Sequence, residues 1–361
     1  MNKIIFVGSF NLRNKPNIYG GQLTACREII EYKEFQKYDF KKIDCVQWVP
    51  IKILDLLFRN LKFSWSLIRY QRVPVIIFSS HGTSFLEKSV MVYLAKLLSH
   101  KVIFFSRSGL LKENLDTSKL YRKKLKKLLE RVTFFVAQSE YWHSYFSSLT
   151  GEFEDKYHTI HNWMDFAKLD DGVYKEECEK KEENSILFLG DLTYDKGLDQ
   201  ALEAIKHLSE VGIDACLKLV GKFPVKPHDL ELIEECRKRD DINIVGPVSD
   251  KVEKKKLLKE AKILLFPSRA EGYPNAVVEG LFYGKIVVSS DTGALKDMIV
   301  DGENGYISPV GDQKALNKNL EKALQNDNQE IVASATASAK KNNDVRVQFD
   351  KLDKLIMKTL A

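Results

Sequence analysis

The sequence predicts an α/β protein with two doubly wound, parallel-sheet domains. Short apolar runs alternate with helical patterns along the chain, and a polar, charge-rich segment divides these runs into two series. The chain has 361 residues, which is enough for two domains of ordinary size. Strands that are separated by helices form parallel sheets with both faces covered.

The first series of apolar runs predicts a first sheet. Its candidate strands are residues 3–7, 42–46, 73–78, 101–105 and 133–137. A polar stretch follows from Phe166 to Asn184, with Glu-Glu-Cys-Glu-Lys-Lys-Glu-Glu at its centre, and such a composition is typical of a linker. We therefore expect a first domain over residues 1–168 and a linker over residues 169–184.

The second series predicts a second sheet, in a domain over residues 185–343. Its candidate strands are residues 185–189, 215–220, 242–245, 263–266 and 286–288. Beyond this domain, residues 344–360 have apolar side chains at helical spacing, among them Val345, Phe349, Leu352 and Ile356. This spacing predicts a last helix.

The charge of the chain is uneven. The formal net charge is +6, but residues 1–170 contain 27 Lys and Arg against 16 Asp and Glu, whereas the remainder contains 29 against 34. A basic first half beside an acidic second half indicates different partners for the two halves and favours an anionic partner for the first.

The cysteines and the apolar runs favour the cytoplasm. Cys26, Cys45, Cys178, Cys216 and Cys236 are an odd number and have no paired or metal-ligand spacing, so a reducing compartment is the simplest setting. No apolar run approaches the about 20 residues that a membrane-spanning helix needs. Residues 1–8 are too short for a signal peptide and fit a first strand.

Two carboxylates stand eight positions apart at the predicted edge of the second sheet. The stretch Glu271-Gly-Tyr-Pro-Asn-Ala-Val-Val-Glu279 lies between the apolar runs 263–266 and 286–288. The pattern predicts a strand, a loop with Glu271, a helix with Glu279, a stop at Gly284 and another strand. Ligands bind at the carboxyl edge of such open α/β sheets.

This stretch resembles the signature of the retaining family-4 glycosyltransferases, which have the GT-B fold. The matching residues are Pro267, Ser268, Glu271, Glu279, Gly284, Thr292, Gly293, residues 301–305 and Asp312. The resemblance extends over about residues 185–325. It implies two Rossmann-like domains facing a cleft, with the last helix, residues 344–361, crossing back to pack on the first domain.

The resemblance also implies a site for a nucleoside-diphosphate sugar in the second domain. It implies that Glu271 contacts the transferred sugar. The segment Gly272, Tyr273, Pro274 and Asn275 would contact the same sugar through the backbone N–H groups of its three non-proline residues. Glu279 would accept hydrogen bonds from the ribose. A carboxylate suits a diol because it offers two acceptor oxygens. The alternative is that both acids only favour the positive end of a helix, an effect of roughly 0.3–1 kcal/mol each.

A second loop of this domain is predicted to bind the diphosphate. Gly190 ends an apolar run, and Lys196-Gly197 begins a helical pattern, where backbone N–H groups and a lysine bind phosphate. By resemblance, Lys196 stabilises the leaving diphosphate, with Gly190 and Asp191 beside it. Family members usually have Arg where Asp191 stands, so one cation is lost and one anion is added.

The first domain offers weaker candidates at the ends of its predicted strands. Gly20 and Gly21 follow the first strand, at the place where the family has a glycine pair near donor and acceptor, and glycine permits a close approach of the backbone. His81 and Arg107 follow the third and fourth strands, and we interpret them as acceptor-side candidates. The alternative for each is an ordinary loop residue.

No cofactor or metal is expected. The chain has no Asp-x-Asp, the pair that glycosyltransferases of the other major fold use to hold a divalent metal, so Lys196 and N–H groups would stabilise the diphosphate. Nucleic acid is not expected as a partner either, because the basic residues do not interleave with aromatic residues in a known module.

Two basic amphipathic segments leave two interpretations open. Residues 119–131 have leucines on one stripe among basic residues, and residues 51–70 have Leu57, Phe58, Leu61, Trp65 and Ile68 beside Lys52, Arg59, Lys62 and Arg69. Such helices can lie on anionic bilayers, or their apolar stripes can pack on the first sheet. One stripe cannot do both.

The predicted function is that of a retaining, metal-independent hexosyltransferase of bacterial surface polysaccharide synthesis, in lipopolysaccharide or capsule. It would transfer a sugar from a nucleoside-diphosphate sugar to a hydroxyl of a glycan or of a lipid-pyrophosphate-linked acceptor, in the cytoplasm or as a peripheral protein at the inner face of the membrane. Asp191 motivates an alternative, a non-catalytic GT-B protein that binds a sugar nucleotide or a partner enzyme. A sugar-nucleotide epimerase is a third interpretation, which explains the basic first domain less well.

Overall fold

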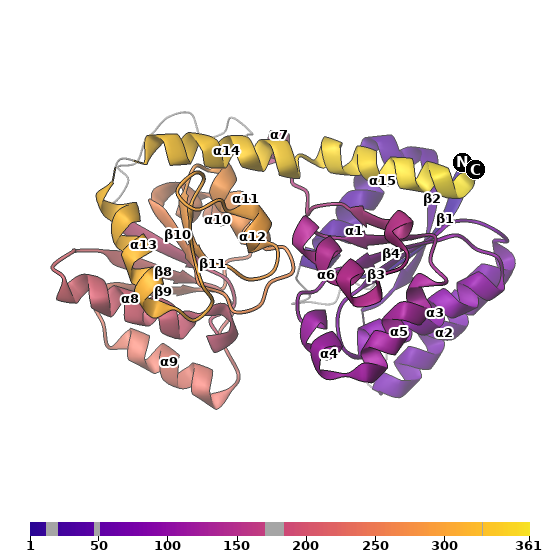
Figure 1. Cartoon of the computed structure of the whole chain (residues 1–361), viewed down its shortest axis with the longest axis horizontal. Helices are drawn as coiled ribbons and strands as arrows, with labels where there is room; N and C mark the ends of the chain where they lie inside the picture. The colour runs from indigo at the N-terminus through magenta and orange to yellow at the C-terminus, as the bar shows by residue number, and fades with distance from the viewer. Residues whose placement is uncertain (12–20, 47–50, 170–183, 327) are drawn as a thin grey trace. The chain divides into compact units, whose positions relative to one another are not determined.

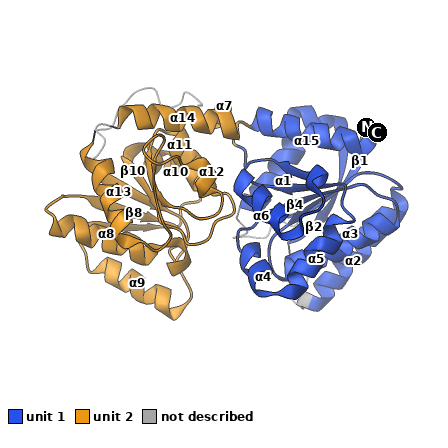
Figure 2. Cartoon of the chain, in the orientation of Figure 1, with its two compact units in different colours: residues 1–163, 345–361 blue, residues 164–344 orange. Residues whose placement is uncertain are grey.

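The computed structural model describes residues 1–11, 21–46, 51–169, 184–326 and 328–361. These residues form two compact units, Met1–Trp163 with Val345–Ala361, and Met164–Asp344 (Figure 2). Each unit has a six-stranded parallel sheet with helices on both faces (Figure 1). The prediction of two Rossmann-like α/β domains is therefore confirmed.

The sheet of the first unit has the strand order β2-β1-β3-β4-β5-β6, and all of its pairings are parallel. Its order reverses between β1 and β3, which is therefore the switch point of this sheet. The central strands β3 and β4 are buried on both faces, as their continuous apolar runs require. The strands are β1 (Asn2–Gly8), β2 (Tyr38–Asp44), β3 (Val75–Ser79), β4 (Val102–Ser106), β5 (Phe134–Ala137) and β6 (Tyr157–Thr159).

Helices cover both faces of this first sheet (Figure 1). One face is covered by α1 (Gly21–Glu31) and the last helix, α15 (Val345–Leu360), whose Phe349 and Ile356 belong to the same apolar core as Ile76 of β3. The prediction that the last helix returns to the first domain is confirmed. The other helices are α2 (Lys52–Arg69), α3 (Thr83–Leu97), α4 (Leu111–Thr117), α5 (Lys119–Leu129) and α6 (Glu140–Thr150), with 3-10 turns η1 (Lys33–Lys37) and η2 (Glu154–Lys156).

The sheet of the second unit has the strand order β12-β11-β10-β7-β8-β9, again all parallel. Its order reverses between β7 and β10, so the loops that follow these two strands lie at the switch point, where α/β sheets bind ligands. The strands are β7 (Ser185–Leu189), β8 (Cys216–Val220), β9 (Ile242–Gly246), β10 (Ile263–Phe266), β11 (Ile286–Ser290) and β12 (Tyr306–Ser308).

Two helices of the second unit begin at side-chain caps. The Asp250 side chain accepts from the Glu253 N–H at the start of α10, and the Asp312 side chain accepts from the Ala315 N–H at the start of α13. The helices are α7 (Phe166–Leu169), α8 (Leu198–Glu210), α9 (Pro227–Arg237), α10 (Lys251–Glu260), α11 (Asn275–Phe282), α12 (Leu295–Met298), α13 (Gln313–Gln325) and α14 (Gln329–Asn343), with the 3-10 turn η3 (Tyr194–Lys196).

The structure differs from the sequence prediction at four places. The strand predicted at residues 42–46 is β2, which begins and ends earlier in the chain, and the short strands β6 and β12 were not predicted. The first unit ends at Trp163 rather than at residue 168, because Phe166 stacks on Phe282 of the second unit's α11 with 4.5 Å between ring centroids. Residues 170–183 of the predicted linker lie outside the described residues.

Candidate functional site

The loop after β7 lies directly against the loop after β10. Gly197 has φ +79° and ends the η3 turn, and a Cβ atom at this position would lie 2.1 Å from the carbonyl oxygen of Pro267. The Arg269 N–H donates to the Asp195 carbonyl at 2.9 Å. Only glycine permits this approach, which fixes Lys196 at the switch point.

The two residues predicted to be catalytic meet at this point. Nζ of Lys196 lies 2.5 Å from Oε1 of Glu271, although the residues are 75 positions apart in the chain. The Glu271 side chain is buried, at 8% exposure, whereas that of Lys196 is 29% exposed. The buried carboxylate of Glu271 is therefore paired with the ammonium of Lys196, which is partly exposed to water and so accessible to an anionic ligand.

The predicted sugar-binding segment lies between Glu271 and α11. Pro274 is the residue before the first residue of α11, so Gly272 and Asn275 lie where a helix presents its backbone N–H groups and the positive end of its dipole. The side chain of Tyr273 is buried, and its hydroxyl oxygen accepts a hydrogen bond from Nδ2 of Asn343 at 2.8 Å. Burial raises the pKa of this hydroxyl. Tyr273 thus anchors the segment to α14.

Glu279 has a partner that the sequence analysis missed. Its Oε1 lies 2.6 Å from Nζ of Lys254, which comes from α10. The signal in the sequence was the lysine-rich start of that helix, Lys251-Val-Glu-Lys-Lys-Lys256, but spacing alone did not connect it to Glu279. The pair holds a largely buried carboxylate on α11 with a partly exposed cation beside it.

Gly190 and Asp191 lie at the end of β7, where members of the resembled family usually have an arginine in place of Asp191. The Gly190 N–H donates to the Val220 carbonyl at 3.0 Å, which holds the end of β7 against β8, and Asp191 is exposed. Arg269 is a candidate to replace the usual arginine, because its loop lies against the loop after β7. Both of its terminal nitrogens donate to the carboxylate of Asp199 at 2.7 Å, so its guanidinium already has a partner.

The acceptor-side candidates belong to the first unit. His81 and Arg107 follow the neighbouring strands β3 and β4; Nδ1 of His81 lies 2.9 Å from Oγ of Ser108, and His81 is exposed. Gly21 begins α1, and Gly20 lies outside the described residues. Gly21, His81 and Arg107 follow the strands β1, β3 and β4, at the carboxyl edge of the first sheet and at or next to its switch point.

Arg107 is held between two aromatic rings. Its guanidinium carbon lies 5.1 Å from the ring centroid of Phe78 and 5.3 Å from that of Trp163. Burial lowers the pKa of Arg107 to about 10, and the nearby Cys26 and Glu28 act in the opposite direction. Packing on Trp163 is therefore a firm structural role of this residue.

The chain is similar to known glycosyltransferases. Residues 173–342 match the family model described as glycosyl transferases group 1. The capsular polysaccharide biosynthesis glycosyltransferase CapM of Staphylococcus aureus is 22% identical over 315 residues, which are 82% of this chain and 79% of that protein. An undecaprenol-linked-glycan α-1,4-N-acetyl-D-galactosaminyltransferase of Campylobacter jejuni is 34% identical over 166 residues, 44% of each chain.

The similarity to solved structures covers the whole chain. The crystal structure of HepE from Anabaena in complex with UDP and glucose matches 99% of this chain and 100% of that chain, with a TM-score of 0.75 and 16% sequence identity. At this identity the match shows the fold. The chain spans less than half the length of most of the curated relatives it matches. The part of the chain that matches the glycosyl transferases group 1 model lies in the second unit, which contains the Lys196–Glu271 pair.

Proposed function

We propose that the protein is a retaining glycosyltransferase that moves a hexose from a nucleoside-diphosphate sugar to a hydroxyl of a glycan or of a lipid-linked sugar. The observation that supports this most strongly is the Lys196–Glu271 pair at the β7/β10 switch point. An accessible cation beside a buried carboxylate suits a ligand that has an anionic diphosphate and a polyhydroxylated sugar.

The proposed reaction exchanges one bond to the anomeric carbon for another. The bond to the diphosphate oxygen breaks, the bond to the acceptor oxygen forms on the same face of the sugar, and the acceptor proton passes to an oxygen of the departing diphosphate. Lys196 stabilises the charge on the diphosphate, and Glu271 accepts hydrogen bonds from sugar hydroxyls. The start of α11 adds N–H dipoles, so this chemistry requires no metal.

The comparisons support the substrate classes in this proposal. The HepE structure contains UDP and glucose, and the Campylobacter jejuni relative is named for a glycan acceptor linked through pyrophosphate to undecaprenol. CapM and the colanic acid relative of Escherichia coli are named for bacterial polysaccharide synthesis. We propose the same kind of pathway for this chain, in the cytoplasm and in peripheral contact with an anionic membrane.

Transfer itself tests the proposal. The protein is incubated with a panel of nucleoside-diphosphate sugars and with lipid extract from a polysaccharide-producing bacterium, and release of nucleoside diphosphate and labelling of the lipid fraction are measured. We expect one sugar nucleotide to be consumed with labelling of lipid and with retained anomeric configuration. An inverted configuration would contradict the retaining mechanism, and no consumption of any donor would contradict the enzyme.

Replacing Glu279 by Ala is expected to weaken nucleotide binding. The substitution removes the predicted acceptor for the ribose hydroxyls and leaves Lys254 near the site without this carboxylate. Charge-assisted hydrogen bonds contribute roughly 1.5–3 kcal/mol, so the Kd for the preferred nucleoside diphosphate should rise by about tenfold or more in titration calorimetry. The control is Glu260→Ala, which removes a carboxylate that pairs with Lys218 and Lys256 elsewhere in the unit. An unchanged Kd in Glu279→Ala would refute the ribose assignment.

The non-catalytic alternative rests on Asp191, and a charge reversal tests it. Asp191→Arg exchanges an exposed anion for a cation next to the predicted diphosphate position, and one unit charge at about 4 Å contributes about 1 kcal/mol in water. Because the reversal changes the charge by two units, or about 2 kcal/mol, we expect binding of the nucleoside diphosphate to tighten by roughly thirtyfold at low salt, and less at high salt.

The native chain should already transfer sugar in this experiment. Asp214→Arg makes the same charge change before β8, at the opposite edge of the sheet, and should leave binding unchanged. If the native chain is inert and Asp191→Arg alone is active, the non-catalytic alternative replaces the proposed enzyme.

A further inference from the structure

Helix α2 has its apolar face toward solvent. Ile53, Leu57, Phe58, Leu61, Trp65 and Ile68 are between 54% and 70% exposed, and at about 100° per residue they lie on one side of the helix. An amphipathic surface helix ordinarily directs this face to the core. Of the two interpretations left open by the sequence, packing of this stripe on the first sheet does not apply to α2. In α5 most of the stripe packs inward, because Leu125, Leu128 and Leu129 are buried, whereas Leu120 is exposed.

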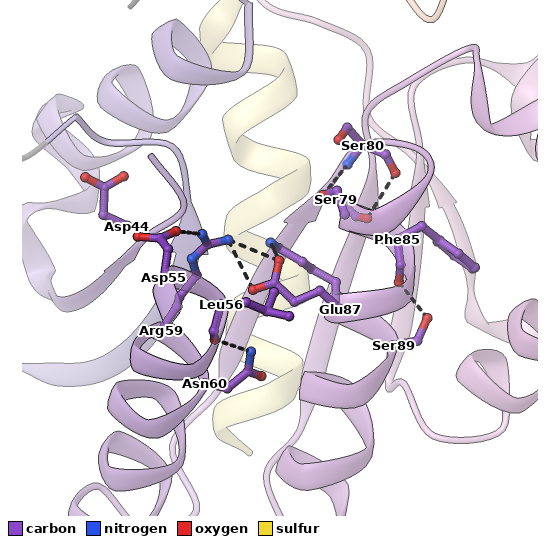
Figure 3. A network of polar contacts seen from close by, with 12 residues as sticks. Asp44, Asp55, Leu56, Arg59, Asn60, Ser79, Ser80, Phe85, Glu87 and Ser89 are labelled. Atoms are coloured by element: carbon purple, nitrogen blue, oxygen red, sulfur yellow. Dashed lines mark hydrogen bonds and ion pairs between the residues drawn. The ribbon is translucent and has the colours of Figure 1, made fainter. Parts of the chain in front are cut away.

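The opposite side of α2 is fixed to the protein by charged groups. Arg59 pairs with Asp55 on its own helix and with Glu87 of α3 at 3.1 Å, and Glu87 pairs with the buried Lys88 at 2.5 Å (Figure 3). Phe63 is buried on the same side. Breaking a buried ion pair costs several kcal/mol, so the network prevents α2 from turning its apolar side inward.

Exposed apolar side chains also lie on the neighbouring helices α3 and α5. Val90, Tyr93 and Leu97 of α3 and Leu120 of α5 are about half exposed or more. Helix α3 packs against both α2 and α5 (Figure 1). Exposed apolar side chains on three neighbouring helices indicate an interaction site.

The charges around this face identify the kind of partner. The acidic residues of α2, α3 and α5 are Asp55 and Glu87, and both are in the inward network, whereas the basic residues include the exposed Lys62, Arg69, Lys119, Lys123 and Lys127. Lysines at positions 119, 123 and 127 share one side of α5. A second copy of the chain would bring a like-charged face against this one, whereas an anionic surface complements it.

We propose that the outward face of α2 inserts into the headgroup region of an anionic lipid bilayer. The features that interfacial helices need are present: a row of apolar side chains, Trp65 with Arg69 stacked over its ring at 5.3 Å, and flanking lysines. Lysines near such a surface each contribute about 1 kcal/mol of attraction to anionic lipid. No helix among the described residues is long and apolar enough to cross a membrane, so the contact is peripheral.

Vesicle co-sedimentation of the full chain tests this surface. We expect binding to vesicles that contain phosphatidylglycerol, weaker binding at high salt, and little binding to phosphatidylcholine alone. Leu61→Gln combined with Trp65→Gln should reduce the partition coefficient by about tenfold or more, because two apolar side chains no longer enter the lipid. Lys119→Gln, Lys123→Gln and Lys127→Gln together should reduce it on anionic vesicles only.

The matched control is a change of exposed apolar residues on helices of the second unit, Leu230→Gln with Val252→Gln, which should bind as the native chain does. An equal loss in this control, or no binding of the native chain to anionic vesicles, would overturn the proposal. So would a dimer of the native chain that Leu61→Gln with Trp65→Gln dissociates without a change in vesicle binding, because α2 would then bind a second copy.

Two further readouts keep the result interpretable. The fluorescence of Trp65 should shift to shorter wavelength on anionic vesicles. Trp65→Phe should remove that shift while vesicle binding persists. A fluorescence shift that remains in Trp65→Phe would overturn the assignment to α2. Nucleoside-diphosphate binding is measured on the same variants. Loss of vesicle binding with nucleotide binding kept in Leu61→Gln with Trp65→Gln supports this surface, and vesicle binding kept in that variant refutes it, whatever the outcome for the proposed transfer reaction.

Discussion

Lys196→Met is expected to reduce kcat for sugar transfer by roughly 10³-fold or more, because it removes a preorganised cation from the departing diphosphate. Methionine retains most of the length of the side chain, so the loss reports the charge. The ammonium of Lys196 is partly exposed, but the carboxylate of Glu271 is buried, so loss of the cation should lower the unfolding midpoint without unfolding the chain. Circular dichroism and the unfolding midpoint should therefore show a folded variant.

A double variant separates the two roles of this pair. Adding Glu271→Gln removes the buried carboxylate that Lys196→Met leaves without its partner, so it should recover the lost stability without restoring transfer. Lys226→Ala is the matched control, since this lysine is 73% exposed and pairs with Asp195 of the same loop at 3.8 Å. Transfer by Lys196→Met at the native rate would refute the catalytic assignment.

Gly197→Ala is expected to be the most destabilising of the substitutions considered. The residue has φ +79°, which disfavours alanine, and the added Cβ would lie 2.1 Å from the backbone oxygen of Pro267. Because backbone cannot move as a flexible side chain can, the loops after β7 and β10 must separate. We expect a loss of about 3 kcal/mol or more in the free energy of unfolding, measured by urea denaturation.

Gly212→Ala is the control that isolates the crowding. Gly212 has φ +75°, but an added Cβ would meet nothing within 4 Å. Alanine there should cost only about 1 kcal/mol, the cost of the left-handed conformation. Gly197→Ala should also abolish nucleotide binding, because Lys196 moves with its loop. Equal destabilisation by the two substitutions would show that the β7 and β10 loops are not in the contact described.

The longer strands and the loops that follow them could be predicted from the sequence. Runs such as 263–266 are apolar on both faces and end at a proline, and that is sufficient to identify a buried parallel strand and the edge where it stops. The sequence therefore predicts that Lys196 and Glu271 lie at the edge of one sheet. The strands β6 and β12 were missed because each has three residues, too few to show a period.

The pairings between distant elements could not be predicted in this way. The contact of Lys254 with Glu279 depends on how α10 packs beside α11, and neither residue type nor spacing specifies it. The orientation of α2 depends on the pairing of Arg59 with Glu87, 28 positions away in the chain. Amphipathic periodicity gives the sides of a helix, but tertiary contacts decide which side faces inward.

The central claim is that the β7/β10 switch point of the second unit binds a nucleoside diphosphate, and thermal unfolding tests it most directly. The unfolding midpoint of the native chain and of Glu279→Ala is measured with a panel of nucleoside diphosphates and their sugars. A ligand that binds only the folded state raises the midpoint, by about 2.7 kcal/mol of added stability at 100 times its Kd. We predict that one base stabilises the native chain and has a much smaller effect on Glu279→Ala. If no nucleotide raises the midpoint of the native chain, or if Glu279→Ala responds as the native chain does, the site is not where these residues place it.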